Sequence, residues 1–306
     1  MMNLTGQEIG NYKLLDLLGQ GGSADVYLGE HKYCQSCVAV KILRKVASPS
    51  STTNKWEKWG SNESHILSHI THPYITHMHE YGTQDNIQFL VMDWATRGTL
   101  LDLFATSLPI STVATYIKQI AYALQYLHRI HITHRDVKPS NILVKQDVSI
   151  LLADFGLAIG YRTISYRNFQ STSGAIHATT TAYAAPEETQ KRPCPASDQY
   201  ALGVLVYQWL CGELPFHGST AEMIAQHSNS SPPPLREKAP TLSCAVEQVV
   251  LTALAKDPSS RFTSIQTFAE VFEQVSQSSA YWTPTICWYS SPVAGLDSPA
   301  NSPYTG

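Results

Sequence analysis

The chain has 306 residues, a formal net charge of -3 and 15% charged residues. That length suits two packed lobes or two ordinary domains and supplies ample apolar material for a core. The slightly acidic balance gives no support for binding to nucleic acid or for attachment to a membrane through basic residues. The six cysteines form no dense framework, so we expect a cytoplasmic protein in a reducing setting.

The N-terminus, "MMNLTGQEIGNYKLLDLLG", lacks the continuous apolar core of a signal peptide. The longest apolar stretch, residues 201–210, is too short for a membrane span, which needs about 20 residues. We therefore expect a soluble chain in which this stretch is a buried helix. A membrane attachment is expected only through a segment beyond residue 306, if one exists.

The first part of the chain is expected to form strands at residues 12–20, 23–31, 37–43 and 87–92. Glycines and polar pairs separate these short runs, as in an antiparallel sheet. Between them, one helical face is predicted from residues at spacings of three and four: Trp56, Trp59, Glu63, Ile66, Leu67 and Ile70. A carboxylate within such an apolar stripe requires a partner.

From about residue 100 the pattern becomes helical. One apolar stripe is formed by Val113, Ile117, Ile120, Leu124 and Leu127. Residues 198–211 are apolar all round, which predicts a central buried helix, and further helices are expected at 245–256 and 264–275. After residue 276 the chain is rich in Ser, Pro and Gly, which is typical of a flexible tail or linker. The order predicts an α+β fold with a small β-rich lobe followed by a larger helical lobe.

Two features of the strand region are candidates for binding phosphate. The glycine-rich turn "LGQGGSADV" (18–26) allows backbone N–H groups to approach phosphate oxygens, although many such turns bind nothing. Lys41 lies on the strand "VAVK", where a lysine is usually only solvated. Here Glu63 offers it a partner, and because each charge would be costly to bury alone, we favour a phosphate-positioning pair.

The run "HITHRDVKPSNILV" (131–144) concentrates ionisable groups between apolar residues. A hydroxyl nucleophile needs a carboxylate to accept its proton, and Asp136 is the candidate base. Lys138 could offset the charge of a transferred phosphoryl group, and Asn141 could hold a metal through its side-chain oxygen. Asp154, in "LLADFGLA", follows a hydrophobic strand and suits a hard cation such as Mg²⁺.

The ordered motifs "GQGGSADV", "VAVK", "HRDVKPSN", "DFG" and "AAPE" resemble the eukaryotic-like (Hanks-type) Ser/Thr protein kinases, in the style of their bacterial branch. The resemblance implies a protein-kinase-like bilobal fold, with an N-lobe at about 12–92 and a C-lobe at about 96–275. Residues 1–11 would be an N-terminal extension, and 276–306 a tail or juxtamembrane linker. It further implies transfer of the γ-phosphate of ATP, with Mg²⁺ or Mn²⁺, to protein serine or threonine hydroxyls.

The resemblance also assigns roles to individual residues. Those implied in catalysis are Lys41, Glu63, Asp136, Lys138 and Thr180, and the implied metal ligands are Asn141 and Asp154. Those implied to contact the nucleotide are Leu18, Gly19, Gly21, Gly22, Val26, Ala39, Lys41, Met92, Asp93, Ala95 and Leu143. Met92 would be the gatekeeper before a hinge whose backbone at Asp93 and Ala95 bonds to adenine.

Structural and regulatory roles follow in the same way. Glu187 is expected to pair with Arg261, and Asp198 is expected to anchor the catalytic loop from the buried helix. Autophosphorylation at Ser171, Thr172 or Ser173 would order the activation segment through Arg135, although a merely polar loop is the alternative. The resemblance allows a homodimer that phosphorylates in trans. Ala24 stands where the family has its third loop glycine, which is costly only if that position needs a positive φ.

Two other functions compete with an active protein kinase. A nucleotide-binding pseudokinase would act as a scaffold or regulator, although the residues needed for transfer are present. A small-molecule kinase of the aminoglycoside type shares the catalytic loop but lacks the segment of Glu187 and its arginine partner. "CQSC" (34–37) has metal-ligand spacing, but without a second pair of ligands we expect a surface hairpin turn.

Overall fold

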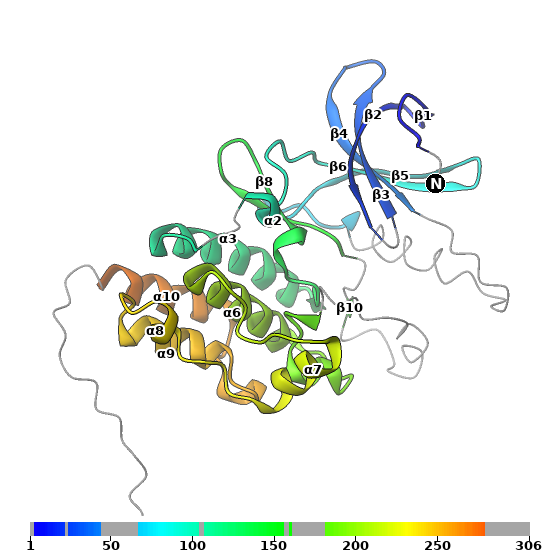
Figure 1. Ribbon diagram of the computed structural model, residues 1–306. Coiled ribbons are helices and arrows are strands. Elements are labelled where there is room, and N and C mark those ends of the chain that lie inside the picture. Colours follow the sequence, from blue (N-terminus) through cyan, green and yellow to red (C-terminus); the bar gives the residue numbers. More distant parts are fainter. Residues whose placement is uncertain are drawn as a thin grey trace, which may run out of the picture.

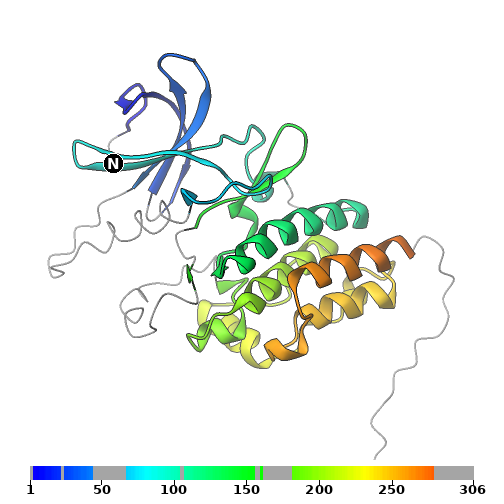
Figure 2. The ribbon, with the colours of Figure 1, turned by 180° about the vertical axis from the view of Figure 1, so that it is seen from behind.

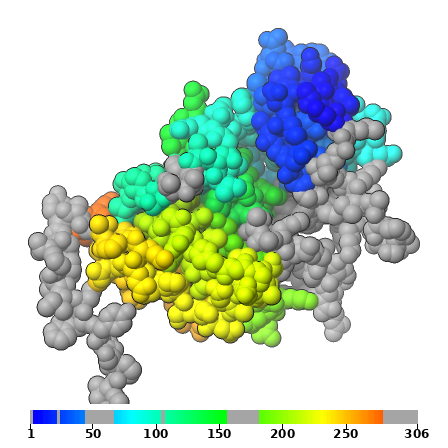
Figure 3. Space-filling view, in the orientation of Figure 1, coloured from blue at the N-terminus to red at the C-terminus, as the bar shows by residue number. Residues whose placement is uncertain are grey.

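The computed structural model describes residues 3–21, 24–43, 67–103, 107–155, 159–160 and 181–278. These form a strand-rich lobe followed by a larger helical lobe, coloured blue to cyan and green to orange in Figure 1. In the space-filling view the blue lobe lies above the green and yellow one (Figure 3). The α+β, bilobal architecture expected from the motif order is confirmed.

The small lobe is built on a 6-stranded antiparallel sheet in the order β1-β2-β3-β4-β6-β5. Its strands are β1 (Glu8–Ile9), β2 (Tyr12–Gln20), β3 (Ala24–His31), β4 (Cys37–Leu43), β5 (Met78–Gln84) and β6 (Ile87–Met92). The expected strands at 12–20, 37–43 and 87–92 are confirmed, and the one at 23–31 begins at Ala24. Strands β5 and β1 were not predicted from the sequence.

The register of the sheet separates two faces, because side chains alternate along a strand. One face carries the small lobe's own core, which includes Tyr27, Val40, Ile42, Phe89 and Val91. Residues of the opposite face are aligned across the strands: Val26 pairs with Lys41, Lys41 with Leu90, and Ala39 with Met92. Leu90 and Met92 belong to the core of the helical lobe, so this second face is directed toward that lobe.

The helical lobe is arranged around helix α6 (Pro195–Cys211), of which nearly every residue from Ser197 to Leu210 is buried. The other helices are α2 (Leu100–Leu103), α3 (Ile110–Arg129), α5 (Pro186–Thr189), α7 (Thr220–Asn229), α8 (Leu235–Lys238), α9 (Cys244–Ala253) and α10 (Ile265–Ser278). Single 3-10 turns are η1 (Pro139–Asn141) and η3 (Pro258–Ser260). Figure 2 shows α3 and α10 side by side. The predicted α3 stripe is buried throughout.

Short strands lie between the two lobes. β8 (Ile142–Val144) and β9 (Ile150–Leu152) form an antiparallel hairpin, and β7 (Ile132–Thr133) pairs with β10 (Ile159–Gly160). The connection from β7 to β8 carries the charged run that starts at His134. This run is therefore held at both ends by strand pairing.

Within the described ranges, no helix combines the length and the hydropathy that crossing a bilayer requires. Cys34 and Cys37 are exposed, have free thiols and lie at the connection of β3 to β4, so the hairpin turn is confirmed. Ala24 lies in β3 without a positive φ and accepts a hydrogen bond from the Gly21 N–H at 2.8 Å. The conditional cost of alanine at this position therefore does not arise.

Candidate active site

The charged loop after β7 is held by a carboxylate of the buried helix α6. Asp198 Oδ1 accepts the backbone N–H of Arg135 at 2.8 Å, and Oδ2 accepts that of His134 at 2.9 Å. Oδ2 also lies 2.7 Å from Nε2 of His128 on α3. Asp198 is fully buried, so these hydrogen bonds replace the water that it loses. The expected anchoring of the loop by Asp198 is confirmed.

Burial alone would raise the pKa of Asp198, but hydrogen bonds and nearby histidines lower it below the ordinary value of an aspartate. The carboxylate is therefore ionised. It holds Arg135 in a backbone conformation with φ of 70°, which costs a non-glycine residue of order 1–3 kcal/mol. The pKa of His134 is lowered from its ordinary value, because the effect of burial exceeds the opposing effect of the surrounding aspartates. The loop thus has its geometry imposed by its buried surroundings.

The loop presents Asp136 together with Lys138 and Asn141. Lys138 Nζ lies 2.8 Å from Oδ2 of Asp136, and Asn141 Nδ2 donates to the same oxygen at 2.7 Å and to the Asp136 carbonyl at 2.9 Å. Asp136 Oδ1 is buried and has no hydrogen-bond partner among the described residues. One oxygen is fixed by two donors, and the other is available to a ligand.

The β8–β9 hairpin brings Asn141 toward Asp154. Asn141 directly precedes β8, Asp154 follows β9 after one residue, and Ala153 N–H donates to the Asn141 carbonyl at 2.9 Å. Lys41 on β4 lies 3.1 Å from Oδ1 of Asp154, which joins the two lobes by an ion pair. Residues from the small lobe, the loop and the segment after β9 therefore meet at one site.

The residues at this site fit a hard divalent cation. Because Nδ2 of Asn141 donates to Asp136, the amide turns its Oδ1 away from that carboxylate. The side chain of Asp154 is 43% exposed, so its carboxylate remains accessible beside Lys41. Amide and carboxylate oxygens are the ligands that Mg²⁺ and Mn²⁺ prefer. Asn141 and Asp154 would hold such an ion.

The glycine-rich strands β2 and β3 form the outer wall of the candidate nucleotide site. Gly19 is paired with Val26, and a Cβ added at Gly19 would meet no atom within 4 Å. Leu18 is 47% exposed at the end of β2. Val26 and Ala39 share the sheet face of Lys41, the face directed toward the helical lobe. Open space beside Gly19 is therefore left on this part of β2, where a phosphate could approach the backbone.

The segment after β6 is fixed to β5 through Asp93. Its N–H donates to the carbonyl of His77 at 3.0 Å, and its carboxylate accepts the His77 N–H at 3.1 Å and lies 2.9 Å from Nε2 of His79. Because the N–H of Asp93 donates to the His77 carbonyl, the carbonyl of Asp93 is the group of this residue's backbone that could accept a hydrogen bond from adenine. Met92 and Ala95 are buried, whereas Leu143, on β8, is half-buried.

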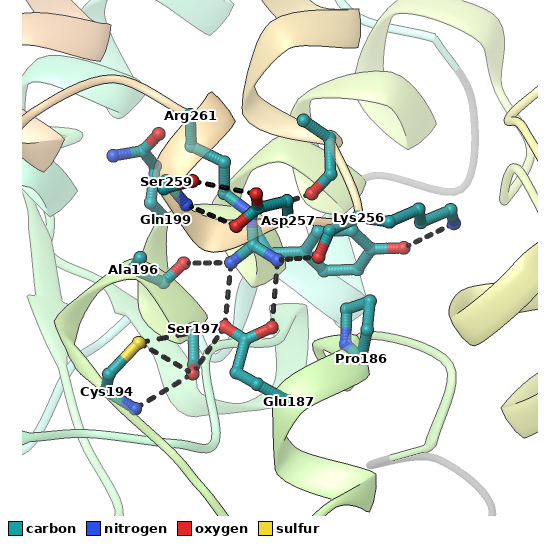
Figure 4. Close-up of polar contacts among 12 residues, drawn as sticks. Pro186, Glu187, Cys194, Ala196, Ser197, Gln199, Lys256, Asp257, Ser259 and Arg261 are labelled. Carbon is teal, nitrogen blue, oxygen red and sulfur yellow. Dashed lines mark hydrogen bonds and ion pairs between the residues drawn. The ribbon is translucent and has the colours of Figure 1, made fainter.

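A second buried ion pair secures the segment that precedes α6 (Figure 4). Arg261 Nη1 and Nη2 lie 2.7 and 2.8 Å from the two carboxylate oxygens of Glu187, which is the bidentate geometry of a strong pair. Ser197 Oγ donates to the same carboxylate at 2.7 Å, and Arg261 also donates to the Ala196 carbonyl. The expected Glu187–Arg261 pair is confirmed.

Several residues named in the sequence analysis lie outside the described residues: Gly22, Glu63, Ser171, Thr172, Ser173 and Thr180. The expected pairing of Lys41 with Glu63 therefore stays a prediction. Leu67 and Ile70 of the same predicted helical face are described and lie in the core, with 1% and 2% exposure.

Sequence reasoning missed two residues beside the loop. His128 was one more residue of an amphipathic helix, and nothing local distinguished it as a partner of Asp198. Glu188 was adjacent to the more conspicuous Glu187. Burial raises the pKa of Glu188 to about 8, although the positive charge of Arg135 lowers it. A glutamate doublet directly after Pro186 was the only available signal, and it did not show that Glu188 lies where the charge of Arg135 acts on it.

Comparison with known proteins identifies this arrangement. A family model described as "Protein kinase domain" matches residues 12–275. The chain belongs to the protein kinase family. The site of Lys41, Asp136 and Asp154 thus lies in a protein kinase domain, and the family implies the use of ATP with a divalent metal ion.

Among similar curated proteins, the serine/threonine-protein kinase PrkC of Bacillus subtilis is 32% identical over 264 residues, which cover 85% of this chain and 40% of that protein. Pkn1 of Myxococcus xanthus is 34% identical over 277 residues, which cover 88% of this chain and 39% of that protein. PknF of Mycobacterium tuberculosis is 32% identical over 276 residues, which cover 86% of this chain and 56% of that protein. The chain thus spans about two fifths to just over half the length of these relatives.

Replacing Glu187 by alanine is expected to destabilise this kinase domain by about 3–5 kcal/mol, because the Arg261 charge would stay buried without its carboxylate. The matched control is Glu273→Ala, which breaks an exposed pair with Lys118 at 3.0 Å and should cost less than about 1 kcal/mol. Urea unfolding of both variants measures the difference. Equal losses would show that the buried pair is not a structural support.

Proposed function

We propose that the chain is a Ser/Thr protein kinase that transfers the γ-phosphate of ATP to serine or threonine hydroxyls of proteins. The observation that carries the proposal is the buried Oδ1 of Asp136, which lacks a partner among the described residues of a protein kinase domain. A buried carboxylate oxygen without a donor is costly. An acceptor hydroxyl would supply that donor.

The proton transfer follows from the fixed geometry of the loop. Lys138 and Asn141 hold Oδ2 of Asp136, so Oδ1 is left to orient and accept the proton of the attacking hydroxyl. A fixed carboxylate of this kind contributes typically 10²–10⁴-fold to the rate. Lys138 Nζ lies beside the same carboxylate, where its positive charge would offset charge on the transferred group.

The nucleotide would lie between the β2–β3 turn and the β8–β9 hairpin. Lys41 would contact phosphate oxygens, and the backbone after Met92 would bind adenine between Val26 and Ala39 on one side and Leu143 on the other. A divalent cation, Mg²⁺ or Mn²⁺, bound by Asn141 and Asp154 would neutralise phosphate charge. The ion pair of Lys41 with Asp154 supports this placement, because it joins the two halves of the site.

The relatives' names support the protein-serine/threonine assignment, since PrkC, Pkn1 and PknF are all named as such kinases. The confirmed Glu187–Arg261 pair argues against a small-molecule kinase of the aminoglycoside type. The partners would be protein substrates and, for transfer in trans, a second copy of the chain. We place the kinase domain in the cytoplasm, where ATP is available.

The proposal predicts that Asp136→Asn lowers phosphoryl transfer at least 100-fold, because the amide keeps the shape of the carboxylate but cannot accept the proton. Transfer of labelled phosphate from ATP to a generic protein substrate, with Mg²⁺ or Mn²⁺, measures the loss. Phosphoamino-acid analysis of the product tests for serine and threonine. The matched control is Asp147→Asn, at an exposed aspartate in the β8–β9 turn, which should keep wild-type activity. Substantial and equal transfer by Asp136→Asn and wild type would contradict the role of Asp136, whereas background transfer by both would favour a pseudokinase.

We further propose that autophosphorylation at Ser171, Thr172 or Ser173 activates the kinase through Arg135. Arg135 lies in the anchored loop, directly before Asp136, and its charge already acts on Glu188 of α5. A phosphate would give this arginine a stronger anionic partner.

Mass spectrometry after incubation with ATP and Mg²⁺ should find phosphate within residues 171–173 of the wild type and none in Asp136→Asn. Replacing the three residues by alanine should then lower the rate of transfer to other proteins. Phosphate found only elsewhere in the chain would contradict this mode of regulation.

A further inference from the structure

A row of polar side chains, Lys256, Tyr200 and His227, links the segment after α9 to Thr181–Ala185, and the chemistry proposed above does not use it. Lys256 Nζ lies 3.3 Å from Oη of Tyr200, which lies 2.9 Å from Nδ1 of His227 on α7. Nε2 of His227 lies 3.1 Å from the carbonyl oxygen of Ala182. Tyr200 and His227 have 0% and 1% exposure. Water therefore does not satisfy these groups.

Donor and acceptor can be assigned for each hydrogen bond between these side chains. A carbonyl only accepts, so Nε2 of His227 must carry a proton and donate to Ala182. Burial, and then the charge of Lys256, lower the pKa of His227 to about 4, so the ring is neutral and its Nδ1 accepts the hydroxyl of Tyr200. The oxygen of Tyr200 then accepts from the ammonium group of Lys256. Each donor has an acceptor, and the tautomer of His227 is fixed.

Aromatic rings fix the position of this imidazole as well. The rings of Phe216 and Tyr200 lie edge-on to it, at centroid distances of 4.9 and 5.7 Å. Lys256 Nζ lies 4.6 Å from the ring centroid of Phe216, within the range of a cation–π contact. Figure 4 shows Lys256 beside the Glu187–Arg261 pair, and Arg261 Nη2 donates to the Lys256 carbonyl at 3.2 Å.

The segment held in this way borders the catalytic loop. Thr181–Ala185 runs directly into α5, whose Glu187 accepts a hydrogen bond from Ser197 Oγ at 2.7 Å. The next residue of α6, Asp198, accepts the backbone N–H of Arg135 in the catalytic loop at 2.8 Å. The strands β2 and β3 would cover the nucleotide from the small lobe. A polypeptide that brings its hydroxyl to Asp136 would then approach along the helical lobe, and we infer that it passes beside Thr181–Ala185.

We propose that His227 is a positioning residue for the protein acceptor. Through its bond to the Ala182 carbonyl, and with Tyr200 and Lys256 behind it, His227 fixes the backbone of Thr181–Ala185 against which the acceptor polypeptide binds. The inference rests on the proposed kinase function. It assigns His227 to acceptor binding and separates it from the binding of ATP.

The first test compares steady-state kinetics of the full chain with a peptide acceptor. His227→Phe keeps a planar aromatic ring but removes the donor to Ala182, so the KM for the peptide should rise at least fivefold while the KM for ATP stays within twofold. His227→Gln, which carries a donor and an acceptor on one side chain, should restore most of the affinity. Tyr200→Phe removes only the outer hydroxyl and should raise the peptide KM by a smaller factor.

The matched control is Ser228→Ala, at the next residue of α7, whose hydroxyl donates to the Ile224 carbonyl of its own helix. It should leave both KM values unchanged. Hydrogen exchange measured by mass spectrometry gives a readout independent of turnover: exchange in 181–185 should accelerate in His227→Phe and in Tyr200→Phe, but not in Ser228→Ala.

An unchanged peptide KM in His227→Phe would overturn the inference, as would a parallel rise in the KM for ATP or unchanged exchange in 181–185. Equal impairment of His227→Gln and His227→Phe would show a merely space-filling role and overturn it too. A wild type that phosphorylates no protein contradicts the proposed function itself. An active wild type with a normal peptide KM in His227→Phe contradicts only the role of His227.

Discussion

One buried carboxylate, that of Asp198, determines the geometry on which the rest of the site depends. It is fully buried in α6 and accepts the backbone N–H groups of His134 and Arg135. Those bonds hold Arg135 in a left-handed backbone conformation that a non-glycine residue rarely adopts. The strain is sustained because the alternative would leave a buried, ionised carboxylate without its two backbone donors, with His128 as the remaining partner. The next residue, Asp136, takes its position from this constraint.

A short hairpin and an ion pair connect the remaining parts of the site to that loop. The β8–β9 hairpin returns the chain so that Asp154 lies near Asn141, and Lys41 reaches Asp154 from the small lobe. On the other side, the Glu187–Arg261 pair and His227 hold the segment that leads into α5. The proposed nucleotide side and the proposed acceptor side are thus supported by separate sets of contacts.

Much of this arrangement could be predicted from the sequence, for physical reasons. The strands at 12–20, 37–43 and 87–92 either alternate apolar and polar residues or are apolar throughout, which predicts strands. Helix α6 is apolar on all sides, which predicts a buried helix. Strand β5, "MHEYGTQ", is polar and half-exposed, and its pairing with β6 depends on tertiary context. Asp136, Asn141 and Asp154 stand in recognisable motifs. His128, Glu188 and the His227–Tyr200 contact join residues far apart in the chain, and no local pattern reveals such contacts.

The most direct test of the central role of Asp198 is the rate of phosphoryl transfer by Asp198→Asn, corrected for the fraction of folded protein. The asparagine amide has the same shape as the carboxylate of Asp198. However, its NH₂ group is a donor and would replace an oxygen that accepts a backbone N–H of the loop. The account predicts at least a 100-fold loss of transfer, with the affinity for ATP within about threefold of wild type, because only the position of Asp136 is disturbed. A transfer rate within threefold of wild type would contradict it.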